Sequence, residues 1–473
     1  MSNIEQNTSV QEWIELQNKH QGNNPAGIII IDGIDGTPEE DSTRLITSGG
    51  VKKELDKTNN KIDEIQKAYF GEYRGTDEPV YVFRIDTEED DPEKAVSYPA
   101  NSANANFTPA TKGSLNSWEG TFIDEIAPCT LKENGQINYW LDKADIFKKL
   151  DGTAAILTGA DGNVCTAFPT MYWKSSIRVK SWKTTTIPAS YENEIAVSRG
   201  QFIGSYPYAH VLDGTVNPYV FVGCFQGLNV GGALKSRYST TEHPTVSQTN
   251  DTFQGYAAAN GAGYSIMTYN TWNMINILAV LIFKNLNIQA VIGNGNVNNS
   301  AGLPLGSSYR AQKGGHAYGT TAGTDPSRLF WIENFWGDRW QFLTGIIKDA
   351  NNVLHINKVN TRFVTQNVTT PTIPAADHTQ ITTGFSKTGG YISKFFGADP
   401  APFFPAENIG ASNKFACDYY WYADGLRTVV VGGNWDYGAR CGLFSCHVNS
   451  APSNAHANIG ARLQKIGTGA AAA

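Results

Sequence analysis

Side chains suited to binding a ligand gather near the end of this 473-residue chain. From Gly432 to Leu463, a frame of Gly, Trp, Leu and Phe alternates with polar residues of unrelated chemistry. The displayed residues are Asn434, Asp436, Tyr437, Arg440, Ser445, His447, Asn449, Ser450, Asn454 and His456, with Tyr419 and Trp421 as accessory aromatics. Tyr and Trp combine a large contact area with a polar group, as in antibody paratopes. This pattern indicates molecular recognition.

Sequence patterns for catalysis are weak. The chain contains no G-x-S-x-G, no H-E-x-x-H, no P-loop and no G-x-G-x-x-G that opens a helix. Glu333 and Asp338 flank the aromatic stretch 331–340, where we expect local hydrogen bonding and core packing. His447 and His456 are close in sequence but lack a third ligand. We therefore expect no catalytic residue, metal or cofactor.

The six cysteines form no C-x-x-C pair, which argues against zinc or thioredoxin-like chemistry. We expect them to be small buried hydrophobic residues. A disulfide from Cys417 to Cys441 or Cys446 stays open.

Alternation from Cys441 onward predicts a strand whose faces differ. Gly442, Phe444, Cys446 and Val448 would point inward, and Cys441, Leu443, Ser445 and His447 outward. We also expect Trp435 and Ile459 to be buried. About half of the aromatic residues 419–422 should be exposed.

Composition excludes several classes of protein. The net charge of −7 and the absence of a Lys/Arg cluster argue against a nucleic-acid surface. No apolar run is long enough to span a bilayer, and residues 1–6 do not open a signal peptide, so we expect synthesis in the cytoplasm and no membrane insertion. Many Gly residues and 11% aromatics favour a β-rich fold.

The chain divides into six predicted regions. Residues 1–48 form an N-terminal attachment segment. Residues 49–70 have apolar residues at coiled-coil spacing, namely Val51, Leu55, Thr58, Ile62, Ile65 and Tyr69. An amphipathic helix on a globular domain is the alternative. Residues 71–110 read as an acidic linker, 111–200 as a β-rich domain, 201–466 as a larger head with a helix at 272–283, and 467–473 as a linker or fusion scar.

The C-terminal residues resemble the variable proteins of diversity-generating retroelements, which carry a C-type-lectin fold of the formylglycine-generating-enzyme type. The resemblance rests on Asp418-Tyr419-Tyr420, Gly425-Leu426-Arg427, Val431-Gly432-Gly433, Trp435, Gly438-Ala439, Gly442-Leu443-Phe444, Ser453-Asn454-Ala455 and Ile459-Gly460-Ala461-Arg462-Leu463. Upstream, Leu45-Ile46-Thr47-Ser48-Gly49-Gly50-Val51 is similar to a phage tail-fibre junction. The resemblance covers roughly residues 45–70 and 150–463.

The resemblance implies an α+β, β-rich protein whose variable region, about 417–463, is rewritten by adenine mutagenesis. The residues at 434, 436, 437, 440, 445, 447 and 456 are all reachable from Asn codons, and 415–463 contains no Lys, Glu, Gln or Met. The implied function is a homotrimeric receptor-binding protein at a phage tail-fibre tip. Its N-terminus would contact tail or baseplate proteins, and its head a bacterial surface protein or glycan.

Three alternatives remain. A bacterial surface-displayed binding protein would need a signal peptide. An enzyme of the formylglycine-generating type would need a cysteine pair within 436–440, which has none. A purely structural tail protein is the third. The calcium-binding Glu-Pro-Asn or Gln-Pro-Asp loop of sugar-binding C-type lectins is also absent, which argues against calcium-dependent lectin activity.

Overall fold

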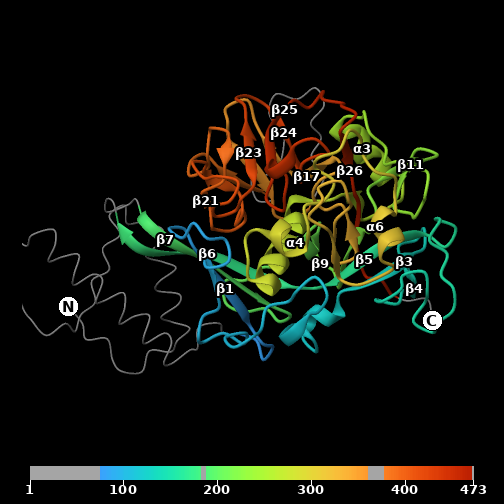
Figure 1. The fold of residues 1–473 in the computed structure, drawn as a ribbon, viewed down its shortest axis with the longest axis horizontal. Coiled ribbons are helices and arrows are strands. Elements are labelled where there is room, and N and C mark those ends of the chain that lie inside the picture. The colour runs from blue at the N-terminus through green and yellow to red at the C-terminus, as the bar shows by residue number, and fades with distance from the viewer. Residues whose placement is uncertain (1–74, 183–187, 361–377, 471–473) are drawn as a thin grey trace, which may run out of the picture. The chain divides into compact units, whose positions relative to one another are not determined.

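Antiparallel β-sheets dominate the computed structural model, which describes residues 75–182, 188–360 and 378–470 (Figure 1). Contacts group residues 73–473 into one unit. The predicted attachment segment 1–48 and coiled coil 49–70 lie outside the described residues. The predicted β-rich α+β class is confirmed.

Two sheets are built mainly from the first half of the described chain. The four-stranded sheet has the order β2 (Val96–Ser97), β1 (Tyr81–Asp86), β7 (Pro188–Ser198), β6 (Tyr172–Trp182). The six-stranded sheet has the order β13 (Tyr264–Ile266), β27 (Leu463–Gly467), β10 (Tyr219–Gly223), β5 (Asn163–Pro169), β3 (Ala127–Leu131), β4 (Ile137–Trp140). Since β27 pairs with both β10 and β13, this late strand lies inside the sheet between two earlier ones.

An eight-stranded sheet carries the C-terminal region. Its order is β19 (His378–Ile381), β18 (Leu354–Asn357), β17 (Trp340–Lys348), β24 (Arg427–Val431), β25 (Cys446–Ser450), β23 (Tyr419–Tyr422), β20 (Gly390–Tyr391), and β26 (Ile459–Ala461) pairs with β17. All nine residues of β17 are buried, as expected for a strand covered on both faces. In Figure 1, β23, β24 and β25 lie side by side in orange and red.

Four smaller sheets and four α-helices complete the described part of the chain. The smaller sheets are β14 (Ala317–Tyr318), β15 (Arg328–Leu329) and β16 (Ile332–Glu333); β11 (Leu228–Val230) and β12 (Ala233–Lys235); β21 (Lys394–Phe395) and β22 (Pro405–Glu407); and β8 (Val211–Leu212) and β9 (Thr215–Val216). The helices are α3 (Asn250–Ala258), α4 (Tyr269–Phe283), α5 (Ile288–Ile292) and α6 (Ser307–Ala311). The chain pattern predicted α4 but not α3.

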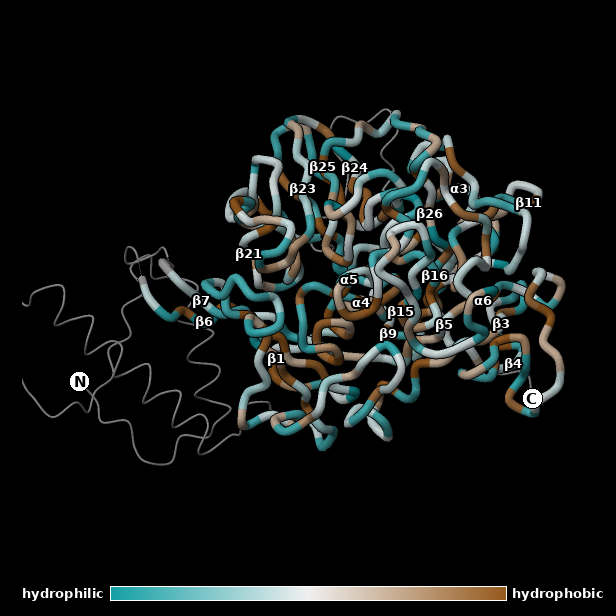
Figure 2. The backbone as a smooth tube through the Cα atoms, in the orientation of Figure 1, coloured by the Kyte–Doolittle hydropathy of each residue, from teal (hydrophilic) through white to brown (hydrophobic). Residues whose placement is uncertain are grey.

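Helix α4 lies at the centre of the core. The Thr268 hydroxyl caps it by accepting a hydrogen bond from the Thr271 N–H, and Lys284 ends it in the left-handed region. All fifteen of its residues are buried, as expected for a helix that is apolar around most of its circumference. The tube in Figure 2 is brown along α4 and along β1. Among the described residues, no helix has the length and apolarity needed to cross a membrane.

Part of the segment expected to be an acidic linker instead belongs to the core. Within β1, the side chains of Tyr81, Phe83 and Ile85 are buried in the main core, and the strand pairs with β7. The acidic run 88–93 is only the loop that follows β1. The short alternating run before it decides the structure, because a strand with an apolar face gains stability from pairing and burial.

The predicted domains 111–200 and 201–466 share a sheet, because β5 from the first pairs with β10 from the second. The segment 467–473 also begins inside the fold: Gly467 pairs with Tyr219 in β10. These long-range pairings join regions that composition alone separates.

Candidate functional site

The Gly432-Gly433 turn leads from β24 into a loop held close to the core. Gly433 has φ +85°, and a Cβ atom there would lie 2.3 Å from the Cys441 sulfur. Only glycine fits both the backbone conformation and the close approach. The loop is also tied to a distant segment, because the Gly438 N–H donates to the Val297 carbonyl at 2.9 Å. Its position is therefore set from two sides.

A buried carboxyl group fixes the end of this loop. Asp418 Oδ2 accepts a hydrogen bond from the Phe444 N–H at 2.7 Å. A Cβ atom on Gly442, whose φ is +154°, would lie 1.9 Å from Asp418 Oδ1. Burial raises the pKa of Asp418 well above its usual range. The anchor turns the chain so that the Phe444 side chain enters the core.

The strand register predicted for residues 441–445 is wrong. Residues 441–445 are a turn rather than a strand, and the outward-pointing positions predicted at Cys441, Leu443 and Ser445 are buried. True alternation begins at β25, where Cys446, Val448 and Ser450 are buried while His447 and Asn449 are partly exposed. Steric fit around Asp418, rather than strand pleating, decides which residues before 446 face inward.

Five aromatic rings meet at one place beside the eight-stranded sheet. Trp340, at the start of β17, is buried, and its ring centroid lies 5.2 Å from Trp421, 5.7 Å from Tyr437 and 5.3 Å from His447. Trp421 also lies 4.5 Å from Tyr419. The four outer rings are partly exposed. We call Tyr419, Trp421, Tyr437 and His447 the aromatic face.

The aromatic face is uncharged near neutral pH. Burial among these rings lowers the pKa of His447 to about 4, so the imidazole is neutral at pH 7. Its Nδ1 lies 3.2 Å from the Ser450 hydroxyl. The ring therefore presents an aromatic surface and no cation.

A polar cavity of ≈ 370 Å³ adjoins the aromatic face. Its lining residues are Asn298, Tyr391, Asp436, Tyr437, Gly438, Ala439 and Arg440. The Arg440 guanidinium lies 5.5 Å from the ring centroid of Tyr419, within cation–π range. Tyr419 in turn contacts Tyr391, with ring centroids 5.1 Å apart. The cavity and the aromatic face are thus continuous.

The structure brings most of the predicted binding residues to the surface. Exposed or partly exposed are Tyr419, Trp421, Asp436, Tyr437, Arg440, His447, Asn449, Asn454 and His456. Asn434, Ser445 and Ser450 are buried. The Ser445 hydroxyl donates to the Arg440 carbonyl at 2.8 Å and the Asn434 amide donates to Asp436 at 2.8 Å. The Asn434 and Ser445 hydrogen bonds hold the loop together, and contact of these three residues with a ligand stays a prediction.

Two of the three predicted frame residues are confirmed. Phe444 and Ile459 are buried, whereas Trp435 is partly exposed. Trp435 lies in the loop, with the Arg339 guanidinium 5.6 Å from its ring. Of the four aromatic residues 419–422, Tyr420 alone is fully buried, so more of this run is displayed than alternation predicts.

Sequence reasoning missed Asn298 and Tyr391 in the cavity wall. Nothing in their local sequence distinguishes them, because they reach the site only through the fold: Tyr391 pairs with Tyr419 across β20 and β23, and the Asn299 N–H donates to the Trp435 carbonyl at 2.6 Å. Trp340 was assigned to core packing, which is confirmed, but it also supports the aromatic face.

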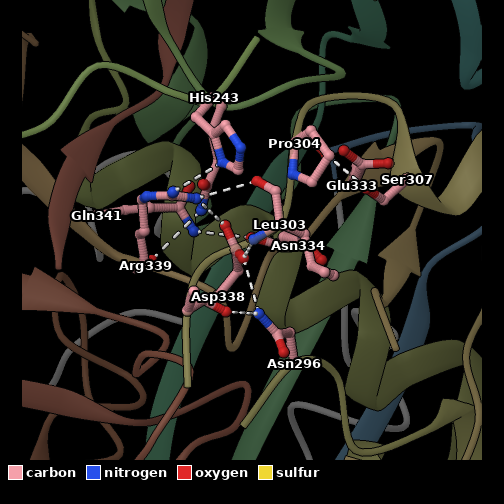
Figure 3. A network of polar contacts seen from close by, with 12 residues as sticks. His243, Asn296, Leu303, Pro304, Ser307, Glu333, Asn334, Asp338, Arg339 and Gln341 are labelled. Carbon is pink, nitrogen blue, oxygen red and sulfur yellow. Dashed lines mark hydrogen bonds and ion pairs between the residues drawn. The ribbon is translucent and has the colours of Figure 1, made fainter. Parts of the chain in front are cut away.

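A polar network around Asp338 (Figure 3) is joined to the loop, because the Trp435 N–H donates to the Asp338 carbonyl at 3.1 Å. Asp338 accepts from the Asn296 amide at 2.9 Å and forms an ion pair with Arg339 at 2.6 Å. Glu333 accepts from the Gly306 N–H at 2.8 Å and from the Ser308 hydroxyl at 2.8 Å. Burial raises the pKa of Glu333 to about 7. Both carboxyl groups have the local hydrogen-bonding role that the sequence predicted.

The six cysteines are free and buried, so their expected role as small hydrophobic residues is confirmed. Cys417 forms no disulfide with Cys441 or Cys446. Burial raises the pKa of Cys441 and of Cys446, which disfavours the reactive thiolate. Within the described residues, no three His, Cys, Asp or Glu side chains are grouped so that they could hold a metal ion.

Comparison with known proteins gives distant structural matches. No protein-family model matches the chain, and no curated protein matches it. The Major Tropism Determinant I1 variant is 13% identical with a TM-score of 0.25, over 71% of this chain and 78% of that one. The M1 variant is 12% identical with a TM-score of 0.26, over 76% and 82%. PvdO from Pseudomonas aeruginosa is 12% identical with a TM-score of 0.27, over 66% and 98%.

These matches are a diversity-generating-retroelement variable protein and a protein of the formylglycine-generating-enzyme-like C-type-lectin type.

Proposed function

We propose that this chain is a receptor-binding protein whose aromatic face, with Asp436, Arg440 and His456, contacts a bacterial surface molecule. One observation carries the proposal: positions far apart in sequence converge on a single face. Trp421, Tyr437 and His447 come from a strand, a loop and another strand, yet the Trp421 ring lies 5.3 Å from Tyr437 and 5.6 Å from His447. Aromatic rings offer a large contact area, and the Arg440 guanidinium offers several hydrogen-bond donors.

The separation of the displayed residues from the main core favours a binding surface whose residues can change while the protein stays folded. Phe444, Val448 and Tyr420 are buried in the main core, whereas Trp421 and Tyr437 pack on a separate cluster that includes Trp340 and Phe342. Because the displayed residues contribute little to this core, we expect exchanges among them to be tolerated. That property suits a surface diversified by adenine mutagenesis. Comparison of the gene with a nearby template repeat tests this: differences should be confined to adenines within codons 417–463.

The proposed setting is a phage tail-fibre tip, with a C-type-lectin fold of the formylglycine-generating-enzyme type in residues 201–466 and a trimeric coiled coil at 49–70. The N-terminal segment would attach to tail or baseplate proteins. Three heads on one fibre would gain avidity from weak individual contacts. Light scattering of the full chain should give the mass of a trimer, and a monomer at micromolar concentration contradicts this assembly.

Cell binding tests the proposal directly. Fluorescently labelled chain is applied to a panel of bacterial strains and scored by flow cytometry. We expect binding to a subset of strains, and we expect Tyr437→Ala together with Arg440→Ala to reduce it at least about tenfold, because such anchors each contribute roughly 1–2 kcal/mol or more.

Lys313→Ala is the control, since this side chain is 69% exposed and is not part of the aromatic face. All variants should melt within a few degrees of the parent chain. Undiminished binding by the double variant contradicts the assignment of this face.

A further inference from the structure

We infer that the cavity beside the aromatic face binds a single sugar unit of a surface glycan. This inference rests on the proposed function and assigns its ligand class. The cavity has a volume of ≈ 370 Å³ and is open to solvent, so it has room for one small unit of a larger ligand. Its walls come from three separate parts of the chain: Asn298, Tyr391 in β20, and the loop 436–440.

The lining of the cavity is polar and offers both donors and acceptors. Asp436 Oδ1 accepts from the Asn434 amide at 2.8 Å, and its second carboxylate oxygen adds further accepting capacity. The Arg440 guanidinium supplies several N–H donors. Among the described residues, neither Asp436 nor Arg440 forms an ion pair. Vicinal hydroxyl groups, which donate and accept at once, match this combination.

The charges of the cavity favour a neutral ligand. One carboxylate and one guanidinium line the same space, together with uncharged Asn298 and two tyrosines. The opposite charges of Asp436 and Arg440 leave this lining without a net charge that would select an anion or a cation. A neutral polyhydroxylated ring satisfies both groups.

The cavity lacks what a protein hot spot needs. Apolar anchors of a protein partner require a fully desolvated pocket, whereas Ala439 is the only aliphatic side chain in this lining. Asn298, Asp436, Ala439 and Arg440 are all exposed, so a bound ligand keeps part of its surface in water. Tyr391 and Tyr437 add ring surfaces against which the C–H groups of a pyranose pack. These features favour a sugar over a peptide side chain.

Two measurements on the full chain test this inference. In the first, saturation-transfer NMR is recorded with glucose, galactose, mannose and N-acetylglucosamine at millimolar concentration. We expect at least one sugar to receive saturation, and Asp436→Asn or Arg440→Ala to weaken its binding about tenfold, as for loss of a charged hydrogen-bonding group. Glu119→Gln and Lys313→Ala are the charge-matched controls at exposed positions outside the cavity.

In the second measurement, bacteria that bind the chain are treated with periodate, which cleaves vicinal diols, or with protease. Loss of binding after periodate but not after protease supports the sugar site. Loss after protease with unchanged binding after periodate overturns it, while the proposed receptor-binding function survives. A chain that binds none of the strains contradicts the proposed function itself. Saturation of a sugar that persists in both cavity variants also overturns this assignment.

Discussion

Replacing Phe444 with alanine tests how the displayed face depends on its core. Phe444 is 0% exposed, and its ring centroid lies 4.9 Å from Phe395 and 5.0 Å from Phe403. Its N–H also donates to Asp418 at 2.7 Å. Removing the ring leaves a cavity between the two other rings, and large-to-small changes of this kind destabilise by about 3–5 kcal/mol. We expect a loss of this size for Phe444→Ala.

Urea unfolding followed by tryptophan fluorescence measures the effect, since Trp340 and Trp421 lie on the same sheet. Phe444→Leu keeps most of the volume and should lose less than Phe444→Ala. Tyr437→Ala, at a partly exposed position, should lose little stability. A loss below about 1 kcal/mol for Phe444→Ala would refute the view that this ring holds the loop.

Three further predictions concern the turn, the pH dependence and calcium. Gly433→Ala should destabilise the fold by about 1–3 kcal/mol more than Gly425→Ala. A Cβ atom at Gly433 would lie 2.3 Å from the Cys441 sulfur, whereas at Gly425, which also has a positive φ of +83°, the nearest atom is 3.9 Å away. Equal melting temperatures for the two variants contradict this. Burial raises the pKa of Asp399 from 3.8 to about 7, so the folded state holds this proton more tightly than the unfolded state does. The free energy of unfolding is therefore highest below pH ~4 and falls by up to about 4 kcal/mol as the pH rises through ~7. Asp399→Asn should flatten urea midpoints measured between pH 4 and 8, and an unchanged slope refutes the assignment. Chelating calcium should leave cell binding unaltered, and binding that disappears with chelator and returns with calcium contradicts the expectation drawn from the missing calcium loop.

Local sequence determined those features that depend on near neighbours. Alternation within 446–450 correctly separates Cys446 and Val448 from His447 and Asn449, because side chains in a strand alternate between its faces. The apolar run around Trp272 correctly predicts α4, and Phe444 is buried as expected. Glu333 has the local hydrogen bonds expected of it. In each case the information lies within a few residues.

Tertiary structure decided which segments meet. The run 81–86 becomes a core strand only because β7, about a hundred residues later, pairs with it. Ser445 is buried because the Asp418 carboxyl turns the chain before β25 begins. Tyr391 and Asn298 reach the cavity through strand pairing and loop contacts with distant residues. Local patterns report propensity and burial, whereas these outcomes depend on long-range packing and hydrogen bonding, which assemble the cavity from separated parts of the chain.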